Sequence, residues 1–220
     1  MAWEDIWTDI TNGGNQRWKS GEQETIVYDY IEKQGVISDG MKILVPLAGD
    51  SHFVPHLWSK GHAVAANEMV PLAVETLKSL CGESHVWEVE HVKLGSKKHS
   101  TEHLTIHECS VFDLDIPAGT FDLIYDKDAF GALEIADRSE YLKLMHRLLK
   151  VGGYVALLCR YREDKDRLAG PPFHIDADMV VNEFWTEERG YQLICEEHSI
   201  LPSAMPNSSL QLFLLQKIKD

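Results

Sequence analysis

Apolar and polar positions follow a regular rhythm along the chain. Short apolar runs of strand length alternate with segments whose apolar residues recur at helical spacing. Strands that alternate with helices predict a mostly parallel sheet with helices on both faces. The expected strands cover residues 42–47, 62–68, 104–111, 121–128 and 153–161, and the expected helices cover residues 51–60, 71–81 and 138–150.

The C-terminal part of the pattern departs from this rhythm. After an expected helix at about 176–189, apolar runs at 191–200 and 209–218 follow one another without room for a long helical crossover. Such strands pair as an antiparallel hairpin at a sheet edge. We therefore expect an α/β fold with a doubly wound, mostly parallel seven-stranded sheet and an antiparallel edge hairpin, in a single domain over residues 1–220. Residues 87–103 leave room for a further hairpin or for a long excursion before the third strand.

The negative net charge of the chain limits which kinds of partner it can bind. The chain has 220 residues, with 35 acidic and 21 basic side chains and a formal net charge of -14. This field repels phosphate backbones and anionic membranes, so we expect no nucleic acid and no membrane as partners. No apolar run approaches the roughly 20 residues that cross a bilayer. We expect a cytoplasmic monomer that acts on a small molecule.

Neither cysteine nor histidine spacing predicts a metal site. The four cysteines lie far apart and form no C-x-x-C pair, so we expect free, reduced thiols. His52 and His56 have i, i+4 spacing, but Pro55 lies between them and no third ligand is evident. We therefore expect no bound metal.

The stretch "LVPLAGDS", residues 44–51, ends the first expected strand, where a doubly wound sheet binds its ligand. Glu68 ends the second strand, 19 residues after Gly49, and a carboxylate at about that spacing suits ribose hydroxyls. The lack of further glycines disfavours a dinucleotide and favours a nucleoside without phosphates. Taken alone, these two residues have an equally good structural explanation: Gly49 as a turn residue and Glu68 as a solvated strand end.

Several short motifs together resemble a known family. In chain order they are "WEDIW", "VPLAGDS", "GHAVAANEMVPLAVE", "CSVFDL", "IYDKDAFGAL" and "GPPFHI". This ordered set, from about residue 3 to the final strand, resembles the thiopurine S-methyltransferase family of class I S-adenosylmethionine-dependent methyltransferases. The resemblance implies a Rossmann-like methyltransferase fold, with S-adenosyl-L-methionine as cofactor and S-adenosyl-L-homocysteine as product. It also implies methyl transfer to the sulfur of a small thiol, either a thiopurine or another aromatic or heterocyclic thiol.

The same resemblance implies the residues of the site. The expected cofactor-binding residues are Trp3, Trp7, Leu47, Gly49, Glu68, Ser110, Val111 and Lys127. The expected substrate-binding residues are Trp18, Lys127 and Phe173. Residues 1–20 hold three of the six tryptophans beside the hinge-like "TNGGN", so we expect them to form a lid over cofactor and substrate.

Two positions depart from the family pattern. Lys127 stands where the family has arginine and Asp128 where it has glycine, and these two residues are the only candidates for a catalytic role. A cation at Lys127 suits a thiolate acceptor, but Asp126 or Asp128 could instead hold it in a structural salt bridge. The segment "ILPSAMPNSSL" also lacks the arginine that thiopurine-methylating members often have. Two alternatives therefore stay open: a halide or thiocyanate methyltransferase of the same fold, and a non-catalytic binding relative.

Overall fold

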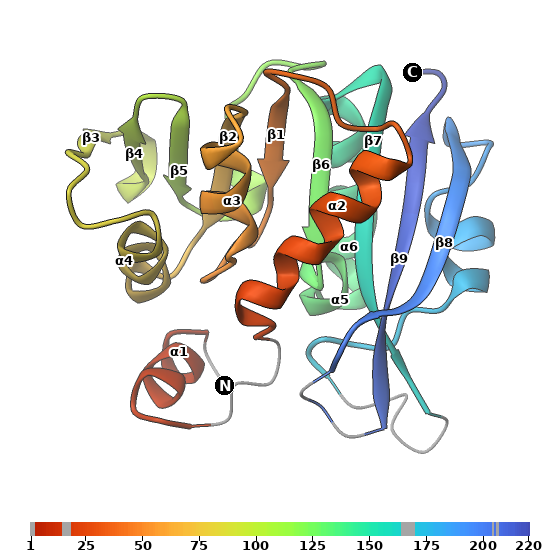
Figure 1. Ribbon diagram of the computed structural model, residues 1–220, viewed down its shortest axis with the longest axis horizontal. Helices are drawn as coiled ribbons and strands as arrows, with labels where there is room; N and C mark the ends of the chain where they lie inside the picture. Colours follow the sequence, from red (N-terminus) through yellow and green to blue (C-terminus); the bar gives the residue numbers. More distant parts are fainter. Residues whose placement is uncertain (1–2, 15–18, 164–169, 204, 206) are drawn as a thin grey trace.

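The computed structural model describes residues 3–14, 19–163, 170–203, 205 and 207–220. Within this part of the chain, nine strands form one sheet with helices on both faces (Figure 1). The strands are β1 (Lys42–Val45), β2 (Ala63–Glu68), β3 (Glu88–His91), β4 (Lys97–Thr101), β5 (Leu104–Glu108), β6 (Phe121–Lys127), β7 (Leu149–Arg162), β8 (Tyr191–Leu201) and β9 (Ser208–Lys217). The helices are α1 (Trp3–Thr11), α2 (Ile26–Lys33), α3 (Phe53–Ser59), α4 (Pro71–Leu80), α5 (Ala129–Ala132) and α6 (Ile135–Leu148), with short 3-10 turns at Gly21–Thr25, Lys93–Gly95 and Val111–Asp113 and a π-helical segment at Met179–Phe184.

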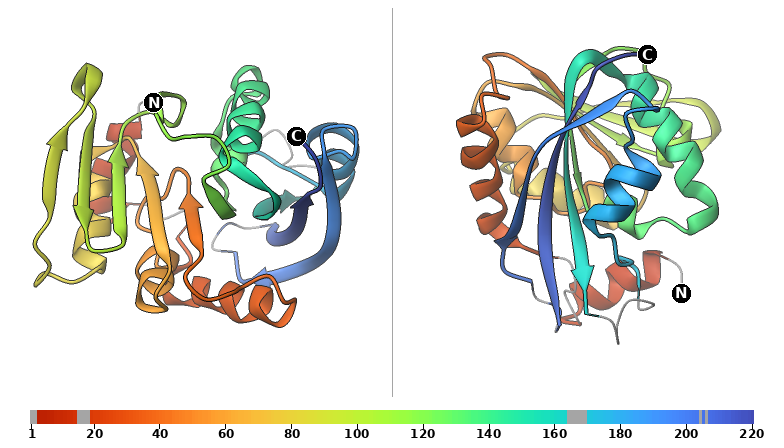
Figure 2. Two further views of the ribbon diagram at one scale, coloured as in Figure 1. Left: turned by 90° about the horizontal axis from the view of Figure 1, so that it is seen from above. Right: turned by 90° about the vertical axis from the view of Figure 1, so that its right-hand side faces the viewer.

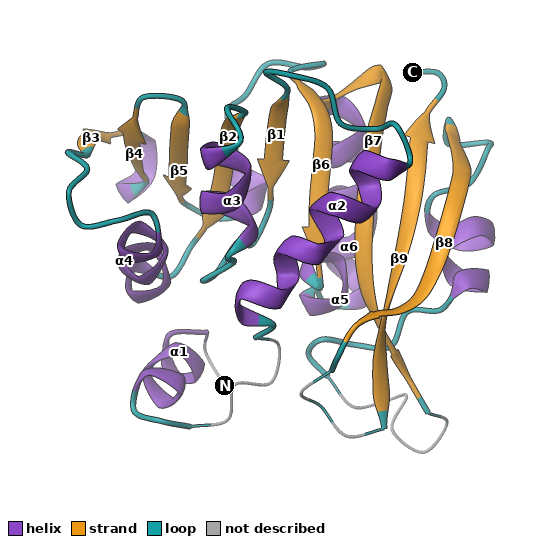
Figure 3. Cartoon of the chain, viewed as in Figure 1, coloured by secondary structure: helices purple, strands orange, loops and turns teal. Residues whose placement is uncertain are grey.

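The strand order is β3-β4-β5-β2-β1-β6-β7-β9-β8 (Figure 3). The five strands from β5 to β7 are parallel, and β9 and β8 add an antiparallel edge hairpin, which confirms the predicted fold class. The predicted count of seven strands is wrong, because residues 88–101 form β3 and β4 at the opposite edge. All four residues of β3 are exposed, so no apolar run marks this strand in the sequence.

The sheet divides the apolar core into two layers, because successive side chains of a strand point to opposite faces. In β1, Ile43 and Val45 join a cluster with residues of α2, α3 and α4. Leu44, between them, joins a cluster with residues of α6 and the π-helical segment. The right panel of Figure 2 shows α2 (orange-red) on one side of the sheet and α6 (green) on the other. The parallel strands are therefore apolar on both faces, which is why their sequence pattern is easy to read.

Two predicted helices differ from the observed ones. The helix expected at 138–150 is α6, which ends earlier, and β7 begins directly at Leu149. The pairing of β7 with β6 jumps from Leu149 to Tyr154, so the four residues between them form an irregularity inside the strand. The helix expected at 176–189 is short: its π-helical part covers Met179–Phe184.

The strand β1 lies between β2 and β6, where the direction of the strand order reverses and a crevice forms beyond the strand ends. After β1 the backbone turns through two left-handed residues, Leu47 at φ 46° and Gly49 at φ 53°. The Ala48 N–H donates a hydrogen bond to the Asn67 carbonyl oxygen at 2.7 Å, which ties this turn to the end of β2. Figure 1 shows α1 beyond the arrowhead of β1, at the same end of the sheet.

Candidate active site

A cavity of about 510 Å³ lies at the carboxyl ends of the parallel strands, and its volume is typical of small-molecule sites. Its wall combines α1, the segment before α2, the loop after β1 and the ends of β2 and β6. The sequence predictions that meet at this cavity are Trp3, Trp7, Leu47, Gly49, Glu68, Lys127 and Asp128. The lining residues that sequence reasoning missed include Lys19, Glu24, Asp50, Ser51 and Pro172.

Glu68 ends β2 with its carboxylate held by backbone donors. Its Oε1 accepts hydrogen bonds from the N–H groups of Met69 (2.7 Å) and Val70 (2.8 Å), and its Oε2 accepts one from Gly49 (3.0 Å). A carboxylate offers about four acceptor positions, so about one position on Oε2 is left for a ligand hydroxyl. Burial raises the pKa of Glu68 above its usual value, and the three backbone hydrogen bonds oppose that rise.

Trp7 covers Gly49. A Cβ atom at position 49 would lie 3.0 Å from Trp7 Cζ2, and the positive φ there also favours glycine. Trp7 is 3% exposed and packs with Val70 and Ala73, and Trp3 packs against the same cluster. Two tryptophans of α1 are therefore seated at the end of the cavity where Glu68 lies.

Polar contacts tie the segment after α1 to the loop after β1. Lys19 forms a salt bridge of 2.5 Å with Asp50, and its Nζ lies 5.6 Å from the centroid of the Trp7 ring. The Ser51 hydroxyl donates to Glu24 Oε1 at 2.8 Å, and the Glu24 side chain is buried. Lys19 and Glu24 are thereby joined to the loop, and Lys19 also contacts Trp7 of α1.

The two residues expected beside the adenine follow β5. The Cys109 N–H donates to the Glu68 carbonyl oxygen at 3.2 Å, which brings this segment to the end of β2. Ser110 Oγ accepts a hydrogen bond from the Phe112 N–H at 3.4 Å, and Val111 is buried in the core. Ser110 and Val111 are not among the described residues that line the cavity. Their contacts with the adenine therefore stay predictions.

At the far end of the cavity, the two carboxylates beside Lys127 have other partners. Asp126 accepts hydrogen bonds from the Tyr141 hydroxyl (2.6 Å) and the Phe130 N–H (3.1 Å), and burial raises its pKa to about 6. Asp128 forms a salt bridge of 2.7 Å with Arg160. Lys127 is half-buried and lines the cavity. Both carboxylates thus have described partners, and Lys127 lies at the cavity wall, where its role with an acceptor stays a prediction.

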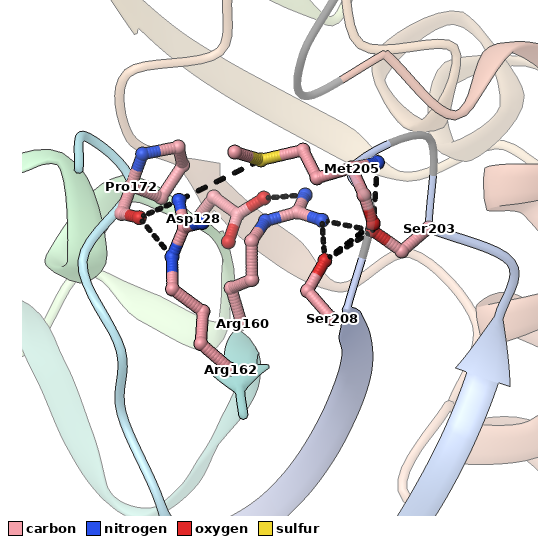
Figure 4. Close-up of polar contacts among 7 residues, drawn as sticks. All are labelled: Asp128, Arg160, Arg162, Pro172, Ser203, Met205 and Ser208. Carbon is pink, nitrogen blue, oxygen red and sulfur yellow. Dashed lines mark hydrogen bonds and ion pairs between the residues drawn. The ribbon is translucent and has the colours of Figure 1, made fainter. Parts of the chain in front are cut away.

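Arg160 and Arg162 are functional candidates that sequence reasoning missed (Figure 4). Arg160 reaches Ser203 Oγ at 2.5 Å in addition to Asp128, and Arg162 donates to the Pro172 carbonyl oxygen at 2.7 and 3.2 Å. Both side chains are buried. Two arginines at i, i+2 on an otherwise apolar strand were a readable signal, because such charges stay buried only when they are paired.

The loop after β7 brings Pro172 to the cavity wall. The Phe173 N–H donates to the Gly131 carbonyl oxygen at 2.7 Å, and the Phe173 ring centroid lies 5.7 Å from the Arg138 guanidinium carbon. Phe173 is not part of the described cavity wall, so its contact with a substrate stays a prediction. Trp18, the other aromatic residue expected to face the substrate, lies outside the described residues.

The described residues contain no group of three or more histidine, cysteine or acidic side chains that could hold a metal ion. All four cysteines are free. In the same part of the chain, none of the helices has the length and apolar character needed to span a bilayer.

The fold is that of known methyltransferases. Burkholderia thailandensis 1,6-didemethyltoxoflavin-N1-methyltransferase, solved with bound S-adenosylhomocysteine, matches with a TM-score of 0.67 and 15% identity, over 98% of this chain and 86% of that chain. A SAM-dependent methyltransferase from Aquifex aeolicus matches with a TM-score of 0.64 and 15% identity, over 98% of this chain and 100% of that chain. The architecture, with its cavity at the switch point, is thus the Rossmann-like fold that these methyltransferases share.

The sequence defines the family within this class. Residues 2–215 match the family model of thiopurine S-methyltransferase. The thiopurine S-methyltransferase of Oryctolagus cuniculus is 28% identical over 181 residues, which are 80% of this chain and 72% of that protein. That of Shewanella piezotolerans is 29% identical over 161 residues, which are 71% of this chain and 70% of that protein. Matches to other such relatives cover as little as 57% of the relative's length. The chain belongs to the thiopurine S-methyltransferase family and is an S-adenosylmethionine-dependent methyltransferase.

Proposed function

We propose that the chain transfers the methyl group of S-adenosylmethionine to the sulfur of a small aromatic or heterocyclic thiol. One observation carries the proposal: a single cavity joins Gly49 and Glu68, which suit a nucleoside, to Lys127, which suits a thiolate. Both groups of residues line the same cavity, so donor and acceptor can be held against each other, and positioning supplies a large part of such a displacement.

The residues at the donor end fit the cofactor. Glu68 keeps about one acceptor position for a ribose hydroxyl, and the loop at Gly49 has no further glycines that would receive a pyrophosphate. Trp3 and Leu47 supply apolar wall. S-adenosylmethionine, when bound there, supplies a methyl group on a positively charged sulfur.

The residues at the acceptor end fit an anionic nucleophile. The thiolate is the reactive form of a thiol, and Lys127 can bind it at the cavity wall. Opposite charges cancel in this reaction, so a site that excludes water favours it. Trp3 and Trp7 of α1 are placed to exclude water at the cavity, which supports a lid role for residues 1–20 within one domain.

The test is a panel of acceptors incubated with the chain and S-adenosylmethionine labelled in the methyl group. Thiophenol, a thiopurine, iodide and thiocyanate cover the thiol proposal and its nearest competitor. We expect labelled methyl thioethers from the aromatic thiols and little product from the inorganic anions. Turnover of iodide or thiocyanate alone would overturn the thiol assignment, and an absence of heat on titration with S-adenosylhomocysteine would favour a non-catalytic relative.

A further inference from the structure

Asp128 and Arg160 form a buried ion pair at the acceptor end of the cavity. The Asp128 Oδ2 and Arg160 Nη2 atoms are 2.7 Å apart, and the two side chains are 6% and 1% exposed. Asp128 lines the cavity and Arg160 does not, and Figure 4 shows the Asp128 carboxylate against the Arg160 guanidinium.

The backbone at position 128 does not call for an aspartate. Its φ is 56°, in the left-handed region that glycine adopts without strain and aspartate tolerates. Asp128 stands at the start of α5, yet its side chain makes no capping hydrogen bond to that helix. The carboxylate is directed to Arg160 instead. The structural consequence of an acidic residue here is therefore the charge pair.

Arg160 depends on Asp128 for its neutralisation. Its other polar contacts are the hydroxyl groups of Ser203 (2.5 Å) and Ser208 (3.5 Å), which carry no charge. Among the described residues, Asp128 is its only ion-pair partner. The Asp128 Oδ1 atom is buried and has no hydrogen-bond partner among the described residues. A pair with a purely structural role would be expected to satisfy this atom.

We propose that this pair determines which thiols the chain accepts: Asp128 masks Arg160, and the acceptor is a thiol that carries no negative charge besides its thiolate. A second anionic group, such as a ring carboxylate, would meet the Asp128 carboxylate in a poorly solvated wall and be repelled. Without Asp128, the guanidinium would become an anion site beside the cavity. This inference rests on the proposed function, because it assigns the chemistry of the acceptor.

Two substitutions of Asp128 separate the loss of its negative charge from the exposure of Arg160. Asp128→Gly suits the left-handed backbone, removes the carboxylate and opens the way to Arg160. Asp128→Asn keeps the shape of the side chain and removes only its charge, so it relieves the repulsion while Arg160 stays covered. The double variant Asp128→Gly with Arg160→Gln removes both charges and serves as the matched control.

The first measurement compares kcat/KM for thiophenol and 4-mercaptobenzoate. We expect the wild type to favour thiophenol by about tenfold or more, and Asp128→Gly to shift the ratio towards the carboxylated thiol by at least about tenfold. Asp128→Asn should shift it less, and the double variant should lose the gain of Asp128→Gly. Unchanged ratios in both single variants would overturn the proposal.

The second measurement does not depend on methyl transfer. An unpaired buried arginine destabilises the fold, so acetate that takes the place of the lost carboxylate should raise the unfolding temperature of Asp128→Gly. At constant ionic strength, acetate should have no such effect on the wild type or the double variant. If acetate stabilises all three proteins equally, Arg160 is not a masked anion site. If Asp128→Gly does not fold even with acetate, the change in the kcat/KM ratio of the two thiols caused by Asp128→Asn tests the proposal.

A wild type that methylates neither thiol would refute the proposed function. In that case the acetate measurement alone would test whether Arg160 is a masked anion site.

Discussion

Glu68 and Glu108 end neighbouring parallel strands in the same register, yet they have different surroundings. Glu68 turns to the cavity and accepts three backbone N–H groups. Glu108 pairs with Lys97 at 2.7 Å and with His99 at 2.8 Å, and it does not line the cavity. These two glutamates therefore provide a matched comparison for the role of a carboxylate in donor binding.

We expect Glu68→Gln to raise the dissociation constant of S-adenosylhomocysteine by about tenfold or more. The amide removes the negative charge that strengthens a hydrogen bond from a ribose hydroxyl, and such bonds contribute about 1.5–3 kcal/mol. Titration calorimetry measures the constant, with the unfolding temperature as a check on folding. Glu108→Gln is the control and should leave the constant within about twofold. Equal effects of the two substitutions would contradict the role of Glu68.

Lys127 permits a second test at the residue scale. Lys127→Met keeps much of the packing of the stem and removes the ammonium. We expect kcat/KM for a thiol that is ionised at the assay pH to fall by about tenfold to a hundredfold, while donor affinity stays unchanged. Lys150→Met, which removes a lysine paired with Asp122 away from the cavity, is the control. If Lys127→Met weakens the donor as much as the acceptor, its charge acts on the whole site rather than on the thiolate.

At the scale of elements, α1 and α2 differ in how they are anchored. Trp7 of α1 packs with Val70 and Ala73 in a small separate cluster, whereas α2 buries Val27 and Ile31 in the main core. We expect S-adenosylhomocysteine to slow amide hydrogen exchange in residues 3–11 and to leave residues 26–33 unchanged. Hydrogen exchange with mass spectrometry measures this difference. Equal protection of α1 with and without ligand would mean that α1 is fixed core rather than a lid.

The elements were predictable to the extent that burial is visible in the sequence. The central parallel strands are apolar on both faces, so their runs stood out. The hairpin of β3 and β4 was left open as one of two alternatives, because β3 is exposed and β4 is polar and mostly half-buried, so neither strand has an apolar run. The closing hairpin was found because β9 has an apolar run and β8 alternates.

At the scale of the whole molecule, histidines with lowered pKa values link stability to pH. Burial, with a smaller effect of Lys98, lowers the pKa of His107 to about 4 from its usual 6.5. Burial also lowers the pKa of His56 and His62. Above about pH 6.5 these side chains are neutral in both states and do not affect stability. As the pH falls towards 4, the unfolded chain binds protons that the folded chain does not, so the free energy of unfolding decreases.

We therefore expect His107→Asn to lose less stability than the wild type between about pH 6.5 and 4. Asp126, whose pKa is raised to about 6, acts in the opposite sense, because the folded state protonates it first. Comparing the two proteins cancels that contribution. Urea unfolding at a series of pH values gives the free energies. Parallel curves for the two proteins would show that His107 titrates normally in the folded chain.

The sequence by itself determined the fold class, the central strands and the resemblance to the family, and it predicted a donor end of the site. Gly49 and Glu68 were readable because strand ends carry the ligand in this architecture, and strand ends follow from local apolar runs. Only the tertiary structure decided the partners of the charged residues. Asp128 meets Arg160 across 32 positions of sequence, and Trp7 covers Gly49 from another element. Side-chain pairing depends on which strands become neighbours, and local periodicity does not contain that information.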